Sequence, residues 1–507
     1  MTPKWGFMLV FVLSCNDARL TTGQLDGTIA QRTDETFRAV HDGDGLGKVT
    51  SDTAGQGDGA AIDALAPAPT KCGIALGCSA PVCSEPGLCL QPKCVSTPSV
   101  GFAFTPPDTV GPTVFQRSGK DVALFALHEG AQSWTMAAEL GSNVTTTAYV
   151  KGIRNSDVVA DGPESQFIVI RSCPGNVASK PFDPAEPTEY CPQSLMRISP
   201  SGFQFAAALP DGPNLGSVAL IHRAGGGLIS VQRGSGDQVL ATMVSTVGAA
   251  TTFAIKVPTT GAAQKYMWAQ QVVATTEGFL TGYYAFPDKD GPSPPVQVVR
   301  YDHSASVLGT EALAPGGYLE TLESLSLPIG AILVTASKLP KWMPTSLAHD
   351  ITREFTLHRL TPEGKLSMSK PFKGAPAAMA PYGITPAPDG GFFAIVTWAY
   401  GFSSPVYLAR LSPSLELQWL KLAIRGTLSG DRASTDMTGQ PEFVALQGDK
   451  FKPVSAFVGG LWPMSNGRLG LSSTLSSQSN SRVETAKTLA FLQTFDHNGN
   501  LLCGFPP

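Results

Sequence analysis

The chain has 507 residues, of which 42% are hydrophobic and only 15% charged, and it contains 53 glycines and 41 prolines. Few charges and many turn-forming residues are typical of large all-β proteins, and the length allows several domains or one large β architecture. The net charge of −4 leaves no basic surplus to neutralise phosphates, which argues against nucleic-acid binding. The seven histidines are scattered without metal-ligand spacing, so we expect neither a metal site nor a cofactor.

The first fourteen residues predict a signal peptide. The apolar run from Trp5 to Leu13 is about half of the ~20 residues that a membrane-spanning helix needs. Val12-Leu13-Ser14-Cys15 then resembles a bacterial lipobox, although Leu13 is bulkier than the usual residue at its position. The resemblance implies that Cys15 carries the lipid anchor of a cell-envelope protein, at the outer membrane or the cell surface, with no other membrane contact. The alternative is an ordinary secretory signal followed by a chance cysteine.

Residues 15–70 predict a disordered linker. From residue 16 to residue 70 there are nine acidic and four basic side chains and a single aromatic, Phe37. Such a composition cannot bury enough apolar surface to offset the entropy lost on ordering. As a flexible coil the segment would span roughly 40 Å. We therefore predict a spacer between the anchor and a folded domain.

A repeated pair of hairpins runs through residues 100–507. One hairpin has apolar-alternating strands around a Ser-Pro, Glu-Gly or Asn-Gly turn, and a second hairpin precedes most copies of it. The turns of this preceding hairpin, near residues 226, 277, 329, 390 and 448, are spaced 51, 52, 61 and 58 residues apart. Four strands in 50–60 residues are the proportions of a propeller blade. The first kind of hairpin occurs seven times, at 123–134, 194–205, 240–253, 296–308, 356–368, 407–419 and 489–503.

These repeats, exemplified by PDGG at 388–391 and LARL at 408–411, resemble degenerate bacterial β-propeller repeats over residues ~100–503. The resemblance implies an all-β fold, a seven-bladed β-propeller with four-stranded blades, and names no functional family. One arginine recurs at the same register of four repeats, which predicts repeated strand-edge salt bridges or stem packing rather than four active sites. These residues are Arg197, Arg300, Arg359 and Arg410.

The cysteines predict disulfides of an oxidising compartment. Five of them, Cys72, Cys78, Cys83, Cys89 and Cys94, define a disulfide-rich segment at 71–99, and their spacing lacks the close pairs of a zinc module. Cys173 and Cys191 bracket one long loop and are expected to pair. The odd cysteine of the cluster then has Cys503 as its partner. We predict a Cys94–Cys503 bond that ties the first strand to the last blade, while the remaining connectivity stays open.

The long connections between hairpins predict a binding face. They fall between the second and third strands of the blades, at 173–192, 286–295, 337–354, 399–405 and 460–487, and loops of this length in compact domains are usually functional or disordered. They bring aromatic side chains to one rim, which suits recognition of a glycan, a peptide or an envelope protein; alternatively, the rings cap small cores of the loops. The candidates are Tyr190, Tyr284, Phe286, Trp342, Tyr400, Phe402 and Trp462.

The sequence favours a binding protein without catalysis, because no local catalytic motif is present. The alternative is a propeller-type glycan hydrolase or lyase, since such enzymes collect carboxylates from separate blades. The candidate catalytic residues of such an enzyme lie on the long-loop side; alternatively, they are ordinary charged loop residues in contact with solvent. They are Asp288, Asp290, His349, Asp350 and Glu354.

Overall fold

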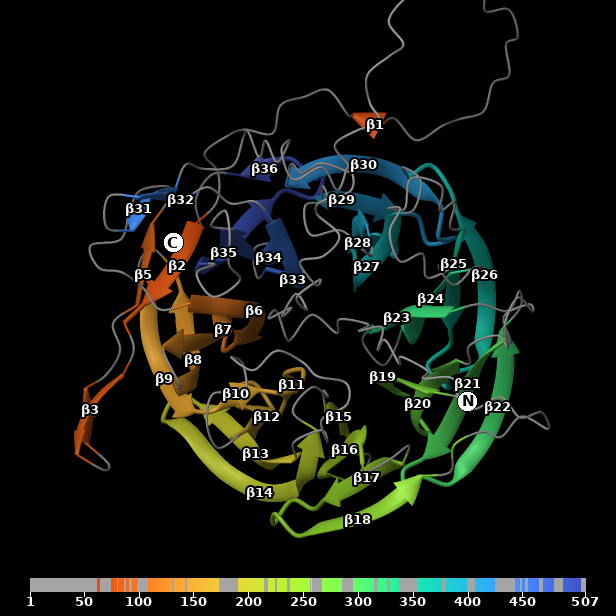
Figure 1. Cartoon of the computed structure of the whole chain (residues 1–507). Coiled ribbons are helices and arrows are strands. Elements are labelled where there is room, and N and C mark those ends of the chain that lie inside the picture. The colour runs from red at the N-terminus through yellow and green to blue at the C-terminus, as the bar shows by residue number, and fades with distance from the viewer. Residues whose placement is uncertain are drawn as a thin grey trace, which may run out of the picture.

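The computed structural model describes residues 62–63, 74–97 and 108–502, with short gaps and with longer ones at 173–189, 258–266, 285–294, 337–353, 399–405, 425–442 and 478–486. Seven antiparallel sheets, each with four strands in its radial path, surround a central axis (Figure 1). The predicted seven-bladed β-propeller is confirmed. Within each blade the strands are called A to D from the axis outward.

The first four blades follow one another along the chain. Blade 1 contains β6 (Asp108–Arg117), β7 (Lys120–Glu129), β8 (Gln132–Leu140) and β9 (Thr145–Lys151). In blade 2 the A position is shared by β10 (Ile153–Arg154) and β11 (Val159–Ala160), followed by β12 (Gln166–Arg171), β13 (Tyr190–Ser199) and β14 (Gly202–Pro213). Blade 3 contains β15 (Ala219–His222), β16 (Leu228–Arg233), β17 (Val239–Val244) and β18 (Ala250–Ile255). Blade 4 contains β19 (Met267–Ala274), β20 (Gly278–Tyr284), β21 (Val296–Asp302) and β22 (Val307–Leu313).

The last three blades continue this order and end with a composite blade. Blade 5 contains β23 (Tyr318–Ser324), β24 (Ala331–Ala336), β25 (Phe355–Leu360) and β26 (Leu366–Phe372). Blade 6 contains β27 (Met379–Pro386), β28 (Phe392–Trp398), β29 (Val406–Leu411) and β30 (Leu417–Ile424), with β1 (Ile62–Asp63) on its outer edge. Blade 7 contains β33 (Ser455–Pro463), β34 (Leu469–Ser477) and β35 (Lys487–Phe495), and the short β36 (Leu501–Leu502) pairs with β35; its fourth strand comes from the N-terminal part of the chain. Two separate hairpins pair β3 (Val82–Glu85) with β4 (Leu88–Leu90), and β31 (Phe443–Leu446) with β32 (Asp449–Phe451).

The blades pack face to face through apolar side chains. β24 is buried along its whole length because it is a second strand covered by blades on both faces, whereas the outer strand β26 is exposed or half-buried throughout. Ile332 and Val334 of blade 5 join one core cluster with Ala394 and Val396 of blade 6. This packing explains why the inner strands read as continuous apolar runs and the outer ones alternate.

Two repeat assignments of the sequence need correction. Residues 123–134 form the end of β7 and the start of β8, which are strands B and C of blade 1 rather than strands C and D. Residues 443–457 contain the separate β31–β32 hairpin, and the first two strands of blade 7 are β33 and β34. Both segments carry turn-like residues inside or beside apolar runs, which is why they were assigned to the wrong strands of their blades. The predicted number of blades is nevertheless correct.

The ring is closed by the N-terminal part of the chain. β2 (Ile74–Cys78) pairs antiparallel with β35 and supplies the fourth strand of blade 7, and β5 (Cys94–Thr97) adds outside it. The short C-terminal strand β36 pairs with the end of the same β35. The N-terminal and C-terminal parts of the chain therefore share blade 7.

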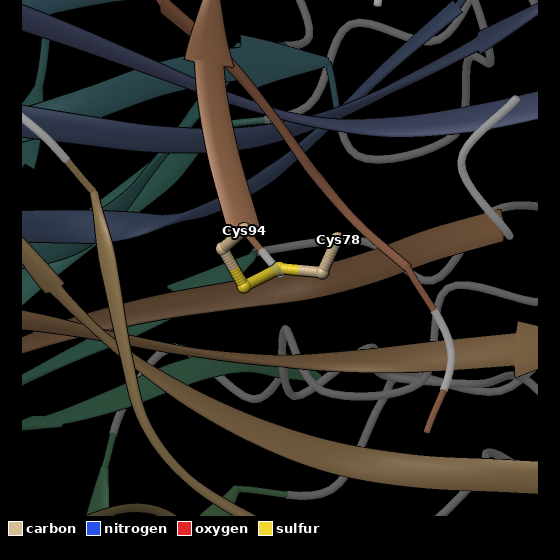
Figure 2. Close-up of a disulfide and its surroundings, with 2 residues drawn as sticks. All are labelled: Cys78 and Cys94. Carbon is tan, nitrogen blue, oxygen red and sulfur yellow. A yellow bond between two sulfur atoms is a disulfide. The ribbon is translucent and has the colours of Figure 1, made fainter. Parts of the chain in front are cut away.

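The predicted Cys94–Cys503 bond is wrong, because Cys94 is bonded to Cys78 (Figure 2). The antiparallel register of β2 and β5 places Cys78 directly opposite Cys94. Both are buried in one core cluster with Leu76, Trp134 and Trp462. The disulfide thus locks two N-terminal strands together at the closure of the ring. Cys72 and Cys503 lie outside the described residues, and the β3–β4 register places Cys83 opposite Cys89.

Glycines in the C–D turns let neighbouring blades approach. A Cβ on Gly499 in the C–D turn of blade 7 would lie 2.4 Å from the Trp419 ring of blade 6, whereas a Cβ on Gly390 in the A–B turn of blade 6 would meet nothing within 4 Å. Both glycines have positive φ, +75° and +84° respectively, so alanine costs about 1–2 kcal/mol of backbone strain at either position. We expect Gly499→Ala to lower the thermal midpoint clearly more than Gly390→Ala, because only the former pushes blades 6 and 7 apart. Equal thermal midpoints for the two variants in calorimetry would contradict the close contact between Gly499 and Trp419.

Candidate functional site

The recurring arginines of strand C bind acidic residues of the A–B turns. Arg197 lies 2.8 Å from Asp161, and Arg300 lies 3.3 Å from Glu277. Arg410 donates to Asp389. The predicted strand-edge salt bridges are thereby confirmed for these three arginines. The hydrogen bond from Arg410 is the main cause that holds the pKa of the Asp389 carboxyl below its usual value.

The fourth arginine connects two blades instead. Arg359 of blade 5 donates to the carbonyl oxygen of Pro413 in blade 6 at 3.2 Å and lies 5.6 Å from the centre of the Phe392 ring. Arg410 lies over the Phe393 ring of its own blade, at 4.7 Å. On the face of the ring formed by A–B and C–D turns, the recurring arginines are therefore engaged in contacts, three of them within one blade and Arg359 between two blades.

The predicted rim aromatics separate into three groups. Trp462 and Tyr284 are buried, with exposed fractions of 4% and 3%, and are core residues rather than rim residues. Trp462 lies near the end of β33, not in a loop, and its ring covers Gly470, its cross-strand partner. Four candidates, Phe286, Trp342, Tyr400 and Phe402, lie outside the described residues.

The remaining candidate, Tyr190, lies on the predicted face. It begins β13 where the B–C loop of blade 2 ends, and 39% of its surface is exposed. Its hydroxyl donates to the carbonyl oxygen of Gly234 in blade 3 at 3.3 Å. The next residue, Cys191, is disulfide-bonded, while Cys173 lies outside the described residues. Tyr190 therefore bridges two blades at the B–C end of the seam between them.

Two buried glutamines lie in this seam between blades 2 and 3. Gln193 follows Tyr190 by three residues in β13, and Gln232 lies in β16, next to Arg233. The Nε2 atom of Gln232 donates to the carbonyl oxygen of Pro210 at 3.0 Å, and the Gln193 amide lies over Gly212 of the same strand, β14. The two side chains therefore converge on residues 210–212.

The amide groups of these glutamines are short of partners. Gln193 is 3% exposed and Gln232 is 1% exposed. Among the described residues, three of these amide atoms lack a hydrogen-bond partner: Nε2 and Oε1 of Gln193, and Oε1 of Gln232. A buried polar group without a partner costs about 1–3 kcal/mol. Arg171, which is paired with Gln193 in the sheet register, adds a buried positive charge beside them.

The inner end of the same seam has a further amide. Asn155, which is 1% exposed, donates its backbone N–H to Val169 and accepts at its carbonyl oxygen from Val218 of blade 3. Within the described part of the chain both side-chain amide atoms of Asn155 lack partners. Amides offer a donor and an acceptor each, so this seam can match ligand hydroxyl or amide groups. We take Tyr190, Gln193 and Gln232 as the candidate binding site.

Two buried tyrosines lie in the apolar core between blades 3 and 4. Tyr283 and Tyr301 of blade 4 share a hydrogen bond of 2.8 Å between their hydroxyls, and burial raises the pKa of both, that of Tyr301 to about 12. Over the described ranges no three His, Cys, Asp or Glu side chains lie close enough to hold a metal. Of the suggested catalytic residues, Glu354 is exposed and the other four lie outside the described residues. No helix in the described part of the chain is long and apolar enough to span a membrane.

The strand order defines this protein as a seven-bladed β-propeller. No family model and no curated protein sequence matches the chain. Similar solved structures include a prolyl endopeptidase studied for the role of inter-domain dynamics, with a TM-score of 0.38 at 14% identity over 81% of this chain and 54% of that one. Prolyl oligopeptidase B from Galerina marginata has a TM-score of 0.38 at 12% identity, over 81% of this chain and 56% of that one. Kuenenia stuttgartiensis hydrazine synthase has a TM-score of 0.38 at 13% identity, over 61% of this chain and 78% of that one. The chain spans about half the length of the two peptidases, and the likeness concerns the fold alone.

Proposed function

We propose that this protein is an extracytoplasmic binding protein whose propeller recognises a glycan at the B–C end of the seam between blades 2 and 3. The observation that carries the proposal is the exposed Tyr190 ring at a seam in which the Gln193 amide and the Oε1 atom of Gln232 have no hydrogen-bond partner among the described residues. An aromatic ring packs on the apolar face of a sugar, and amides bind its hydroxyl groups.

Access to the glutamines depends on Tyr190. Its bond to Gly234, at 3.3 Å, is long for a bond from a hydroxyl donor. A ligand hydroxyl could replace it at little cost, so that the ring turns outward and stacks on the sugar. The opposite face is a weaker candidate because its recurring arginines are engaged by Asp161, Glu277 and Asp389.

Attachment to the cell envelope is part of the proposal. The lipobox-like residues Val12 to Cys15 support a lipid on Cys15, and residues 16–61 would then hold the propeller away from the membrane. Mass spectrometry of the protein extracted from membranes tests this point. A diacylglyceryl group on Cys15 supports the anchor, and an unmodified or absent Cys15 after cleavage elsewhere contradicts it.

We expect Tyr190→Ala to weaken glycan binding by about 5- to 30-fold, because loss of a stacked ring removes about 1–2 kcal/mol. The measurement is binding of the oxidised full chain to a glycan array and a peptide array, followed by titration of the best glycan. Phe205→Ala is the matched control, since Phe205 is an aromatic of the same blade with 65% exposure on the outer strand.

The arrays separate the outcomes. Glycan binding that is weakened in Tyr190→Ala and unchanged in Phe205→Ala supports the proposal. Binding to peptides alone overturns the ligand class. Equal binding by both variants places recognition elsewhere on the ring.

A further inference from the structure

Arg117 places a positive charge inside the seam between blades 1 and 2. It is the last residue of β6, the A strand of blade 1, and only 5% of its surface is exposed. None of the ion pairs among the described residues involves its guanidinium group, and within the same ranges its Nη1 atom has no hydrogen-bond partner. A charge taken out of water is unfavourable unless an opposite charge or hydrogen bonds replace its hydration.

A second arginine of the same face shows what such a residue usually gains. Arg410 is 6% exposed, which is close to the exposure of Arg117, and it donates to the carboxylate of Asp389. Arg117 therefore has the burial of Arg410 without a carboxylate partner in the described part of the chain. This difference marks the Arg117 guanidinium as a place for an anion.

Two carboxylates near this end of the seam are engaged by other groups. Glu139 of β8 forms an ion pair with Lys120. Glu164, in the A–B turn of blade 2, accepts a hydrogen bond of 2.5 Å from the Ser118 hydroxyl, and the Ser118 N–H donates to the carbonyl oxygen of Pro163 at 3.0 Å. The A–B turn of blade 1 is thus fastened to blade 2 directly beside Arg117, which preorganises this end of the seam.

Gln166 lies on the other side of the same seam. It is the first residue of β12, the B strand of blade 2, is 2% exposed, and its Oε1 atom has no hydrogen-bond partner among the described residues. Phe115, two residues before Arg117, and Ile168, two residues after Gln166, pack in one apolar cluster between the blades. Side chains two residues apart in a strand share a face, so Arg117 and Gln166 continue these facing surfaces toward the A–B end.

We propose that Arg117 and Gln166 form a second binding site, which takes a small carboxylate that also carries a hydroxyl group. The guanidinium group binds the carboxylate through charge-assisted hydrogen bonds, and the Oε1 atom of Gln166 accepts from the hydroxyl. A sugar acid combines these two groups. The site lies on the face of A–B and C–D turns, opposite to Tyr190, and is independent of the glycan site in the seam between blades 2 and 3.

The test is the thermal midpoint of the oxidised full chain with and without D-glucuronate, in a buffer free of carboxylates and phosphate, followed by titration calorimetry. We expect glucuronate to bind saturably and to raise the midpoint. Acetate lacks the hydroxyl groups and D-glucose lacks the carboxylate, so both should bind more weakly than glucuronate. Inorganic phosphate is the probe for a general oxyanion site and should also bind more weakly.

Arg117→Met should weaken glucuronate binding by about 10- to 100-fold, because it removes the charged donor. Without ligand its midpoint should equal or exceed that of the wild type, because methionine removes a buried charge. Gln166→Leu should reduce the preference for glucuronate over acetate. Lys120→Met is the matched control: it removes a positive charge from the same turn at an exposed position, so the affinity should change by less than about fivefold.

Each outcome decides the proposal. Weaker glucuronate binding in Arg117→Met but not in Lys120→Met, with the ligand-free midpoint retained, supports it. Glucuronate binding that is lost in Tyr190→Ala and kept in Arg117→Met belongs to the other seam and overturns it. A ligand-free midpoint several degrees lower in Arg117→Met shows that the guanidinium group holds the two blades together and overturns it. Absence of saturable glucuronate binding, or equal binding of glucose or phosphate, overturns it as well.

Discussion

Leu76→Asp is expected to open the ring at blade 7. Leu76 is fully buried in β2, the strand that completes the last blade, and it packs in the cluster that surrounds the Cys78–Cys94 disulfide. Loss of its side chain alone costs about 2–5 kcal/mol, and an unpaired carboxylate in this core adds to the cost. We expect the urea midpoint to fall sharply and residues 74–97 to become the first site of proteolysis.

Val307→Asp is the matched control for this prediction. Val307 lies on β22, the outer strand of blade 4, and is 46% exposed. An aspartate there remains in contact with water, so the midpoint should change little. If the two variants unfold at the same urea concentration, β2 does not close the ring.

Acid is expected to destabilise the protein through His358. This imidazole is 1% exposed in blade 5 and lies between the hydroxyls of Thr335, at 2.9 Å, and Ser369, at 2.8 Å. Burial lowers its pKa from 6.5 to about 4. Between these values the unfolded chain binds a proton that the folded chain does not, so the free energy of unfolding falls as the pH decreases through this window. The difference corresponds to about 3 kcal/mol.

Urea unfolding at pH 7 and pH 4.5 measures this effect. His358→Gln keeps a polar side chain without a titrating group, so its unfolding free energy should depend less on pH than that of the wild type. His497→Gln, at an exposed turn position, should behave as the wild type does. An equal pH dependence in His358→Gln and the wild type would contradict the assignment.

The fold could be predicted because blade hairpins have strong local signals. Turns such as Asp389-Gly390-Gly391 between apolar runs define strand pairs without knowledge of distant contacts. Blade 7 was harder, since Gly459 and Gly460 resemble a loop. In the structure a Cβ on Gly459 would lie 2.3 Å from the carbonyl oxygen of Pro112, so this glycine marks the close approach of blade 1 to an inner strand.

Pairings that depend on three-dimensional register could not be predicted. The spacing of the cysteines gives no preference for Cys78 as the partner of Cys94, which follows only from the pairing of β2 with β5. The same holds for the site. Tyr190 could be named as a candidate because an aromatic at a loop end is visible in the sequence, whereas Gln193 and Gln232 become a pair only when blades 2 and 3 pack together.

The thermal unfolding midpoint of Gln193→Leu tests the central claim most directly. If the Gln193 amide is kept in the seam for a ligand, then leucine, with a similar shape and no polar atoms, should leave the midpoint unchanged or raise it, because it removes a buried amide that has no partner in the described part of the chain. The same variant should lose glycan binding. A midpoint lower by several degrees would show that the amide holds blades 2 and 3 together, and the seam would then not be the binding site.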